Sequence, residues 1–238
     1  FFPYTTLFRS AFGMRIYGFA HLKVKVGIPG QDDVARLKAI RQAVGPGVSL
    51  RIDANEAWTP DNVEPRIREL MPFRIDSVEQ PVKHADVGCL KAVRARLGVP
   101  IMHDESLCGM RDAEAAVVNG TCVLFNLRLS KCGGFLPTLR LAQFASEHGL
   151  ACQLGCQVGE TGILSAAGRH FACSVGGLRF LEGSYDRRLL GDNVLKHDIT
   201  FGRGGWAPAL GGPGLGVEVD EEAVRRLANQ TVELWPAA

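Results

Sequence analysis

The stretch Ser49-Leu50-Arg51-Ile52-Asp53-Ala54-Asn55 is a short apolar run that ends in a carboxylate. Two later runs end in the same way, at Glu79 and at Asp104. The run at residues 125–131 and the earlier run at residues 20–25 each end in a lysine instead. Ionisable groups therefore recur at the ends of short apolar segments, which indicates a repeated structural unit.

The spacing of these end residues predicts the fold. Lys25, Asp53, Glu79, Asp104 and Lys131 follow one another at intervals of 28, 26, 25 and 27 residues. A strand, a helix and two loops fill about this length, since a βαβ unit takes roughly 30 residues. Each ionisable group then lies at the C-terminal end of a strand, and in a (β/α) barrel those ends face one mouth, where the chemistry occurs. We predict an α/β fold, a TIM-type (β/α)7β barrel.

Apolar periodicity and turn residues predict the individual elements. Helices are predicted at residues 32–44, 62–70, 86–97, 111–118, 136–148 and 162–172. Strands are predicted to end near Lys25, Asp53, Glu79, Asp104, Lys131, Leu154 and Glu182. These are seven strands where a closed barrel has eight, so we expect the first barrel strand to be missing from the chain.

The two ends of the chain differ from its middle. Residues 1–10, FFPYTTLFRS, resemble the translation of a sequencing-adaptor oligonucleotide, and we expect a scar outside the fold. The chain would then be cut from a longer gene, and the alternative is a frayed native terminus. Residues 11–216 are predicted to form the barrel domain. Residues 217–238 are predicted to form a C-terminal tail with a short helix at 221–229.

Composition excludes several classes of protein. The 238 residues are 46% hydrophobic and 22% charged, as in ordinary globular proteins. The net charge of +2 indicates neither a nucleic-acid nor a membrane partner, and no apolar run reaches the roughly 18 residues of a spanning helix. Seven scattered cysteines, an odd number, are typical of reduced core thiols, so we expect a cytoplasmic protein.

The strand-end residues offer a metal site and two bases. Asp53, Glu79 and Asp104 are hard oxygen ligands that suit Mg²⁺, with Mn²⁺ as the alternative cation. The alternative interpretation of these three residues is that they are simply exposed carboxylates at strand ends. Lys25 and Lys131 flank this series, and a lysine acts as a base only after it loses its proton. Burial and nearby positive charge would lower the lysine pKa values.

Six motifs, in order and spacing over about residues 18–216, resemble the enolase superfamily. They are Lys23-Val24-Lys25, Asp53-Ala54-Asn55, Val78-Glu79-Gln80-Pro81, Asp104-Glu105-Ser106, Lys131-Cys132-Gly133-Gly134 and Gly159-Glu160-Thr161-Gly162. Within it the chain is similar to the muconate lactonizing enzyme subgroup, which also contains o-succinylbenzoate synthases, dipeptide epimerases and N-acylamino acid racemases. In such proteins a capping domain of over a hundred residues precedes the barrel, so we expect this chain to be truncated at its N-terminus and to lack that domain.

The resemblance also implies roles for the residues. The three carboxylates would bind Mg²⁺. Lys25 and Lys131 would be the acid/base residues on opposite faces of the substrate, and Lys23 would hold Lys25 deprotonated and touch the substrate carboxylate. Glu160 matches a family position near the substrate, and the plainer interpretation is a polar loop residue. Asn55 lies two residues after Asp53 on the same strand face, so it would hydrogen-bond the substrate or the groups around the metal, and the plainer interpretation is a turn residue.

Two positions near these motifs depart from the expected site. Glu105 follows Asp104 directly, so we expect its side chain to point away from the site. Residues 182–186, Glu-Gly-Ser-Tyr-Asp, lack the Asp-x-Asp of dipeptide epimerases, which argues against dipeptide specificity.

The expected reaction is abstraction of a proton α to a carboxylate through a metal-stabilised enolate. The substrate would be a small-molecule carboxylate, and the protein a racemase, an epimerase or a cycloisomerase. The alternatives are β-elimination at the same site, a Schiff-base aldolase with Lys131 as nucleophile, and an inactive truncated fragment. We expect the parent protein to be a homo-oligomer.

Overall fold

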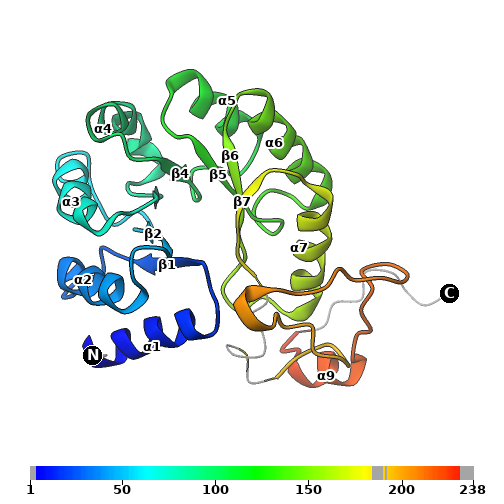
Figure 1. Ribbon diagram of the computed structural model, residues 1–238. Helices are drawn as coiled ribbons and strands as arrows, with labels where there is room; N and C mark the ends of the chain where they lie inside the picture. The colour runs from blue at the N-terminus through cyan, green and yellow to red at the C-terminus, as the bar shows by residue number, and fades with distance from the viewer. Residues whose placement is uncertain (1–3, 184–189, 191, 231–238) are drawn as a thin grey trace.

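A single sheet of seven parallel strands forms the centre of the molecule. The computed structural model describes residues 4–183, 190 and 192–230. The strands pair in chain order from β1 to β7. They are β1 His21–Lys25, β2 Ser49–Asp53, β3 Ser77–Glu79, β4 Ile101–His103, β5 Leu124–Leu127, β6 Ala151–Leu154 and β7 Leu178–Leu181. Figure 1 shows the strands curled around the middle of the molecule with the helices outside them.

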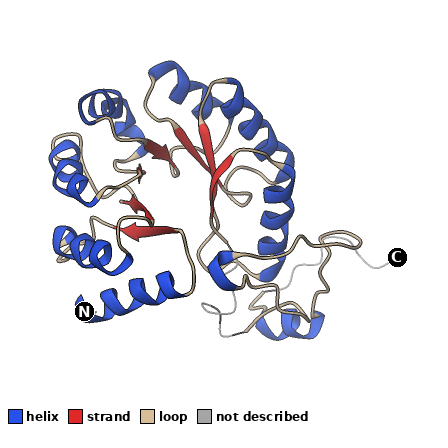
Figure 2. Cartoon of the chain, viewed as in Figure 1, coloured by secondary structure: helices blue, strands red, loops and turns tan. Residues whose placement is uncertain are grey.

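Helices follow the strands in a regular βα alternation, which Figure 2 shows by colour. The α-helices are α1 Tyr4–Ile16, α2 Asp33–Val44, α3 Val63–Leu70, α4 Leu90–Leu97, α5 Met110–Asn119, α6 Phe135–Glu147, α7 Gly162–Ser174 and α9 Glu221–Leu227. The 3-10 turns are η1 Met71–Phe73, η2 His84–Cys89 and η3 Arg203–Gly205. The alternation and the parallel order confirm the predicted α/β barrel architecture.

Helix α1 covers much of the segment that we interpreted as an adaptor scar. Its residues 4–16 are helical, and Arg15 Nη1 donates to Ala43 O of α2 at 3.4 Å. Residues 1–3 lie outside the described residues. The origin of residues 1–10 and the proposed domain boundaries stay predictions.

In strand β2 the apolar and the polar side chains lie on opposite faces of the sheet. Leu50 and Ile52 are fully buried among the apolar core residues. Arg51 and Asp53 are also buried and lie on the opposite face, because side chains alternate along a strand. Both faces are therefore covered, as is usual for parallel sheets. The inner face carries the polar groups.

The register brings the predicted site residues to one level. Lys25 pairs with Asp53 as a Cα partner across β1 and β2, and Asp53 pairs with Glu79 across β2 and β3. The similar spacing of Lys25, Asp53 and Glu79 in the sequence thus becomes a row of adjacent residues in the sheet.

The first and last strands meet through side chains. The rings of His21 and Phe180 lie 5.5 Å apart, centroid to centroid, at an interplanar angle of 72°. The Arg51 guanidinium lies 4.2 Å from the centre of the Phe180 ring. Among the described residues β1 and β7 share no backbone ladder, which agrees with the count of seven strands.

The prediction that a strand ends at Lys131 is wrong. Strand β5 ends at Leu127, and Lys131 lies in the turn that follows. The backbone N–H groups of Lys131 and Cys132 both donate to Arg128 O, at 3.0 and 2.8 Å. These bonds close the turn although apolar residues continue to Leu129.

The C-terminal part packs beside α7. His170 Nε2 lies 2.9 Å from Leu215 O, and Arg169 Nη1 donates to Pro208 O at 3.3 Å. The predicted short helix is confirmed as α9, where Asp220 Oδ1 accepts from Ala223 N at 3.0 Å as an N-cap. Residues 231–238 of the predicted tail lie outside the described residues.

The structure also shows the length of the apolar helices and the exposure of the cysteines. No helix in the described part of the chain combines the length and the apolar character needed to cross a membrane. All seven cysteines are free, but Cys108 and Cys173 are exposed, so the interpretation as core thiols holds only for some of them.

Gly27, two residues after Lys25, provides a test of the packing around β1. Its φ is +76°, and a Cβ there would lie 2.5 Å from Ala57 Cβ. We expect Gly27→Ala to lower the free energy of unfolding by about 3 kcal/mol, from left-handed strain and overpacking together. Gly30 has a φ of +77° and no described heavy atom within 4 Å of its Cβ position, so Gly30→Ala should cost only about 1 kcal/mol. Urea denaturation measures both, and equal losses would contradict the packing argument.

Candidate active site

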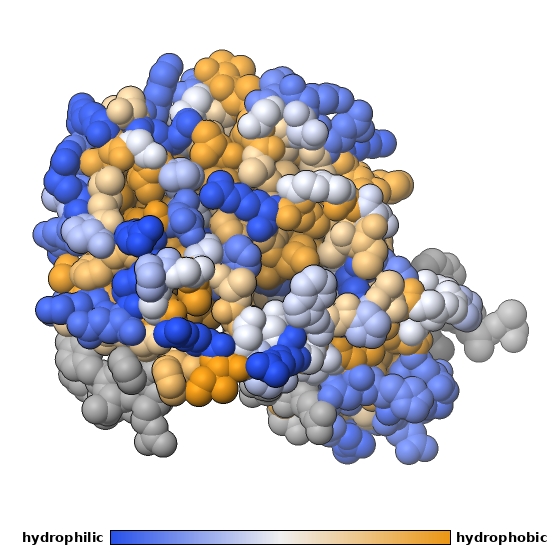
Figure 3. Space-filling view, viewed as in Figure 1, coloured by the Kyte–Doolittle hydropathy of each residue, from blue (hydrophilic) through white to orange (hydrophobic). Residues whose placement is uncertain are grey.

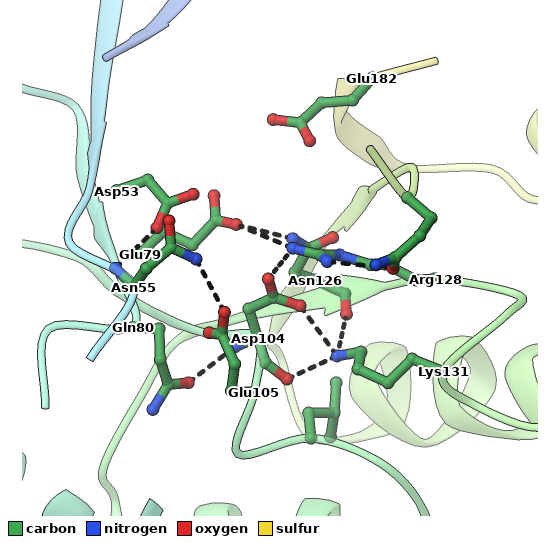
Figure 4. Close-up of polar contacts among 12 residues, drawn as sticks. Asp53, Asn55, Glu79, Gln80, Asp104, Glu105, Asn126, Arg128, Lys131 and Glu182 are labelled. Atoms are coloured by element: carbon green, nitrogen blue, oxygen red, sulfur yellow. Dashed lines mark hydrogen bonds and ion pairs between the residues drawn. The ribbon is translucent and has the colours of Figure 1, made fainter. Parts of the chain in front are cut away.

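The carboxylates at the strand ends meet inside the curled sheet. Asp53, Glu79 and Asp104 are each 0% exposed. In Figure 3 hydrophilic residues gather near the centre of the face in view, with apolar residues around them. Figure 4 shows the three carboxylates side by side, together with amide and cationic side chains from β5 and the turn after it.

Lys23 is the cation at the centre of this cluster. Its Nζ lies 2.7 Å from Glu182 Oε1, 3.2 Å from Glu79 Oε1 and 3.3 Å from Asp53 Oδ2. Burial alone would lower its pKa, but the three carboxylates outweigh burial and raise the pKa above the ordinary lysine value. Lys23 therefore remains a positive charge and is unsuited to act as a base.

Lys25 is the more accessible lysine of β1. Its Nζ lies 2.7 Å from Asp53 Oδ2 and donates to Asn55 Oδ1. Its side chain is 46% exposed, against 17% for Lys23. Because the Lys25 ammonium is paired with Asp53 but remains accessible, it can move away from that carboxylate when another ligand binds there.

Asn55 connects Lys25 to the loop that follows β4. Its Nδ2 donates to Glu105 Oε1 at 2.8 Å. The prediction that Glu105 points away from the site is therefore wrong. Strand β4 ends at His103, so the two-residue alternation does not extend to Glu105.

Lys131 reaches the cluster from the opposite end of the carboxylate series. Its Nζ donates to Asp104 O at 2.5 Å and to Asn126 O at 3.1 Å, and lies 3.0 Å from Asp104 Oδ1. Burial lowers the pKa of Lys131, and the neighbouring Arg128 guanidinium acts in the same direction. The direction of this shift suits a lysine that exchanges a proton with a substrate.

The strand-end pattern missed three polar neighbours of the carboxylates. Asn126 Nδ2 donates to Glu79 Oε1 at 2.8 Å, and Gln153 Nε2 donates to Glu79 Oε2 at 3.3 Å. Arg128 pairs with Asp104 and lies 4.0 Å from Glu79. Asn126 and Gln153 lie in β5 and β6, one residue before each strand ends, so a pattern of ionisable strand-end residues does not include them.

Glu182 and Glu160 line a second part of the site. Glu182 follows β7 and pairs with Lys23, a contact that the strand-end motifs do not predict. Glu160 accepts from Gln157 N at 2.9 Å and from Ser165 Oγ at 3.3 Å, so it organises its own loop. Both glutamates line a cavity of about 310 Å³. The rest of the segment that departs from Asp-x-Asp, residues 184–186, lies outside the described residues.

The carboxylates are paired with cations rather than gathered around one point. Among the described residues, no three His, Cys, Asp or Glu side chains are arranged to hold a metal ion. Burial is the main cause that raises the pKa of Glu79, whereas Lys23 and Lys25 outweigh burial at Asp53 and lower its pKa. The donor set itself, three buried carboxylates, fits a hard divalent cation such as Mg²⁺.

This geometry has a counterpart among known proteins. Residues 8–223 match the family model described as "Enolase C-terminal domain-like". The chain belongs to this family. The resemblance found in the strand-end motifs is therefore confirmed at the level of the superfamily.

Relatives within the superfamily include epimerases and racemases as well as a muconate cycloisomerase. The chain is 43% identical over 157 residues to a hydrophobic dipeptide epimerase of Enterococcus faecalis, covering 66% of this chain and 44% of the relative. It is 32% identical over 212 residues to an N-succinyl-L-Arg/Lys racemase of Bacillus cereus, covering 88% and 56%. A solved structure of the E. faecalis dipeptide epimerase, complexed with Mg and L-Leu-L-Tyr, superposes with a TM-score of 0.84 at 33% identity, covering 92% of this chain and 61% of that one.

The enolase C-terminal domain described here spans about half the length of these curated relatives. The assignments of individual site residues, the cytoplasmic location and the homo-oligomeric state stay predictions.

Lys23 and Lys25 form a matched pair for testing charge compensation. We expect Lys23→Met to lower the free energy of unfolding by about 3 kcal/mol, because it leaves buried carboxylates uncompensated. Lys25→Met should cost about 1 kcal/mol or less, since Lys25 is half exposed and Asp53 keeps its contact with Lys23. Urea denaturation without divalent cations measures both values. A larger loss for Lys25→Met would contradict this account of the cluster.

Proposed function

We propose that the chain carries the acid–base centre of a Mg²⁺-dependent racemase or epimerase that acts at the carbon α to a carboxylate. The observation that carries the proposal is the placement of two lysines at the two ends of one buried carboxylate cluster. Lys25 contacts Asp53, and Lys131 contacts Asp104. The activities named for the relatives, epimerase and racemase, support the same reaction class.

Asp53, Glu79 and Asp104 would hold the metal ion. When bound, the divalent cation stabilises the negative charge that develops on the substrate carboxylate. The ammonium of Lys25 and the guanidinium of Arg128, which now compensate two of these carboxylates, would give them up to the metal. The Mg complex of the E. faecalis enzyme supports this choice of cation.

The lysines divide the work according to their surroundings. Lys23 remains protonated between three carboxylates and would attract the substrate carboxylate. One of Lys25 and Lys131 would remove the α-proton, and the other would return a proton on the opposite face. Removal on one face and return on the other inverts the stereocentre. If only one of the two lysines transfers a proton, the same site would support a cycloisomerisation.

Substrate contacts would come from the groups around the lysines. Asn55 lies between Lys25 and Glu105, and Glu160 lines the 310 Å³ cavity with Glu182. We propose small N-substituted amino acids as substrates. N-acylamino acids come first, because residues 182–186 lack the Asp-x-Asp of dipeptide epimerases, and dipeptides are the second class. The names of the relatives support both classes.

Exchange of the α-proton in D₂O tests the reaction. The 238-residue chain, and a longer protein that contains it, are incubated with Mg²⁺ and L- or D-enantiomers of N-succinylamino acids and dipeptides. NMR follows loss of the α-proton signal. We expect Mg²⁺-dependent exchange, with Lys25→Ala and Lys131→Ala each lowering the rate about 10²–10⁴-fold for one enantiomer.

The outcomes separate the mechanisms. If both lysine variants exchanged the α-proton at the rate of the unmodified protein, the two-base assignment would be contradicted. Borohydride trapping of a substrate on Lys131, without any need for Mg²⁺, would replace it with Schiff-base chemistry.

Metal titration tests the ligand set without any substrate. Asp53→Asn, Glu79→Gln and Asp104→Asn should each weaken Mn²⁺ binding at least about tenfold, since each removes an anionic oxygen ligand. Asp76→Asn is the control, because Asp76 lies at the other end of the sheet, where it accepts from Ser49 Oγ and Leu50 N. Calorimetry measures the affinities. An unchanged affinity in the three ligand variants would place the metal elsewhere.

A further inference from the structure

Gln80 is a buried amide that connects two of the strand ends in the site. It follows Glu79 directly and is 0% exposed. Its Oε1 accepts from the backbone N–H groups of Asp104 at 2.9 Å and Ser106 at 3.1 Å. Its Nε2 donates to Ser106 Oγ at 2.6 Å and to Val82 O at 2.8 Å. Figure 4 shows the amide reaching from the end of β3 to the loop after β4.

The backbone of Gln80 is held in an unfavourable conformation. Its φ is +34°, in the left-handed region that side-chain-bearing residues seldom adopt. Pro81 follows, and a residue before proline is ordinarily extended. Backbone bonds hold Gln80 on both sides, from its N–H to Met102 O at 2.9 Å and from Glu56 N–H to its carbonyl at 2.8 Å. A glycine at this position would relieve the strain, but it would lack the side-chain amide that makes these hydrogen bonds.

Such strain persists where the surrounding structure fixes it, and it concentrates at functional sites. Gln80 lies between Glu79, which it follows, and Asp104, whose N–H it binds. Two of the three carboxylates assigned to the metal are therefore tied together by one side chain. The third, Asp53, is already in register with Glu79 through the sheet. Glu79 and Asp104 have no such register, because β3 pairs Glu79 with Met102.

We propose that Gln80 is a positioning residue that sets the Asp104 carboxylate relative to Glu79 for binding of the divalent cation. By fixing the Asp104 N–H, the amide fixes the position from which this side chain projects after β4 has ended. Gln80 itself does not bind the metal, because Asp104, Ser106 and Val82 already engage both ends of its amide. This inference rests on the proposed metal site.

A purely structural role would give a different result. Loss of the amide leaves the N–H groups of Asp104 and Ser106 without their acceptor, so either role lowers the thermal stability. Only a positioning role also weakens metal binding in the folded protein. Groups that orient metal ligands typically change affinity by about 10–100-fold.

The experiment compares three variants of the 238-residue chain. Gln80→Met keeps the length of the side chain and removes all four amide bonds, whereas Ser106→Ala removes only the hydroxyl contact. Gln143→Met is the control, since Gln143 is exposed on α6 and bonds only locally to Glu147 at 2.8 Å. Mn²⁺ affinity is measured by electron paramagnetic resonance well below each Tm. We expect about 10–100-fold weaker binding in Gln80→Met, a smaller loss in Ser106→Ala and none in Gln143→Met.

The outcomes distinguish this inference from the proposed function. If the unmodified chain binds no Mn²⁺, the proposed metal site fails, and the inference fails with it. If the unmodified chain binds Mn²⁺ and folded Gln80→Met binds it equally well, only the inference is overturned. If Gln80→Met does not fold by near-ultraviolet circular dichroism, Ser106→Ala decides: weaker binding supports the positioning role, and unchanged binding overturns it.

Discussion

The structure depends on compensation of the buried carboxylates that parallel strands bring to one edge. Ions removed from water cost several kcal/mol each unless they are paired. Lys23 meets this requirement for Asp53, Glu79 and Glu182 at once, at distances of 3.3, 3.2 and 2.7 Å. Because Lys23 belongs to β1 and Glu182 follows β7, the same contacts join the first and last strands. The charge cluster therefore contributes to the fold as well as to the site.

The same compensation competes with function. A metal ion would bind these carboxylates only by displacing cations that already pair with them. Lys25, with its half-exposed side chain, can swing away from Asp53, whereas Lys23 is enclosed and has three partners. The two lysines on one strand face thus have different surroundings, since Lys23 is enclosed by carboxylates and Lys25 is accessible. Their sequence positions are equivalent, and only burial separates them.

The spacing of the end residues was sufficient to predict the fold and half of the site. Register in a parallel sheet follows from repeat length, so Lys25, Asp53 and Glu79 could be placed side by side from the sequence. Prediction failed where strands had ended. Lys131 lies in a turn and Glu105 faces the site, since strand alternation has no meaning beyond the last ladder residue.

The amides were missed for a different reason. Gln80, Asn126 and Gln153 carry no charge, so they do not stand out in a pattern of ionisable groups. Their importance comes from burial and from hydrogen bonds between elements far apart in the sequence. Neither of these is encoded in the local pattern.

The backbone immediately after the strands helps the sheet to fix the positions of the side chains in the site. Asn55, Glu56 and Gln80 all have positive φ, at 43°, 63° and 34°, and all lie within three residues of a carboxylate at the end of β2 or β3. Each such residue costs about 1–3 kcal/mol, which the packed sheet must offset. Helix-facing side chains such as Leu50 and Ile52 supply that stability without touching the chemistry. Stability thus resides on the outer face of the strands, and it supports the strained turns that hold the polar groups of the inner face.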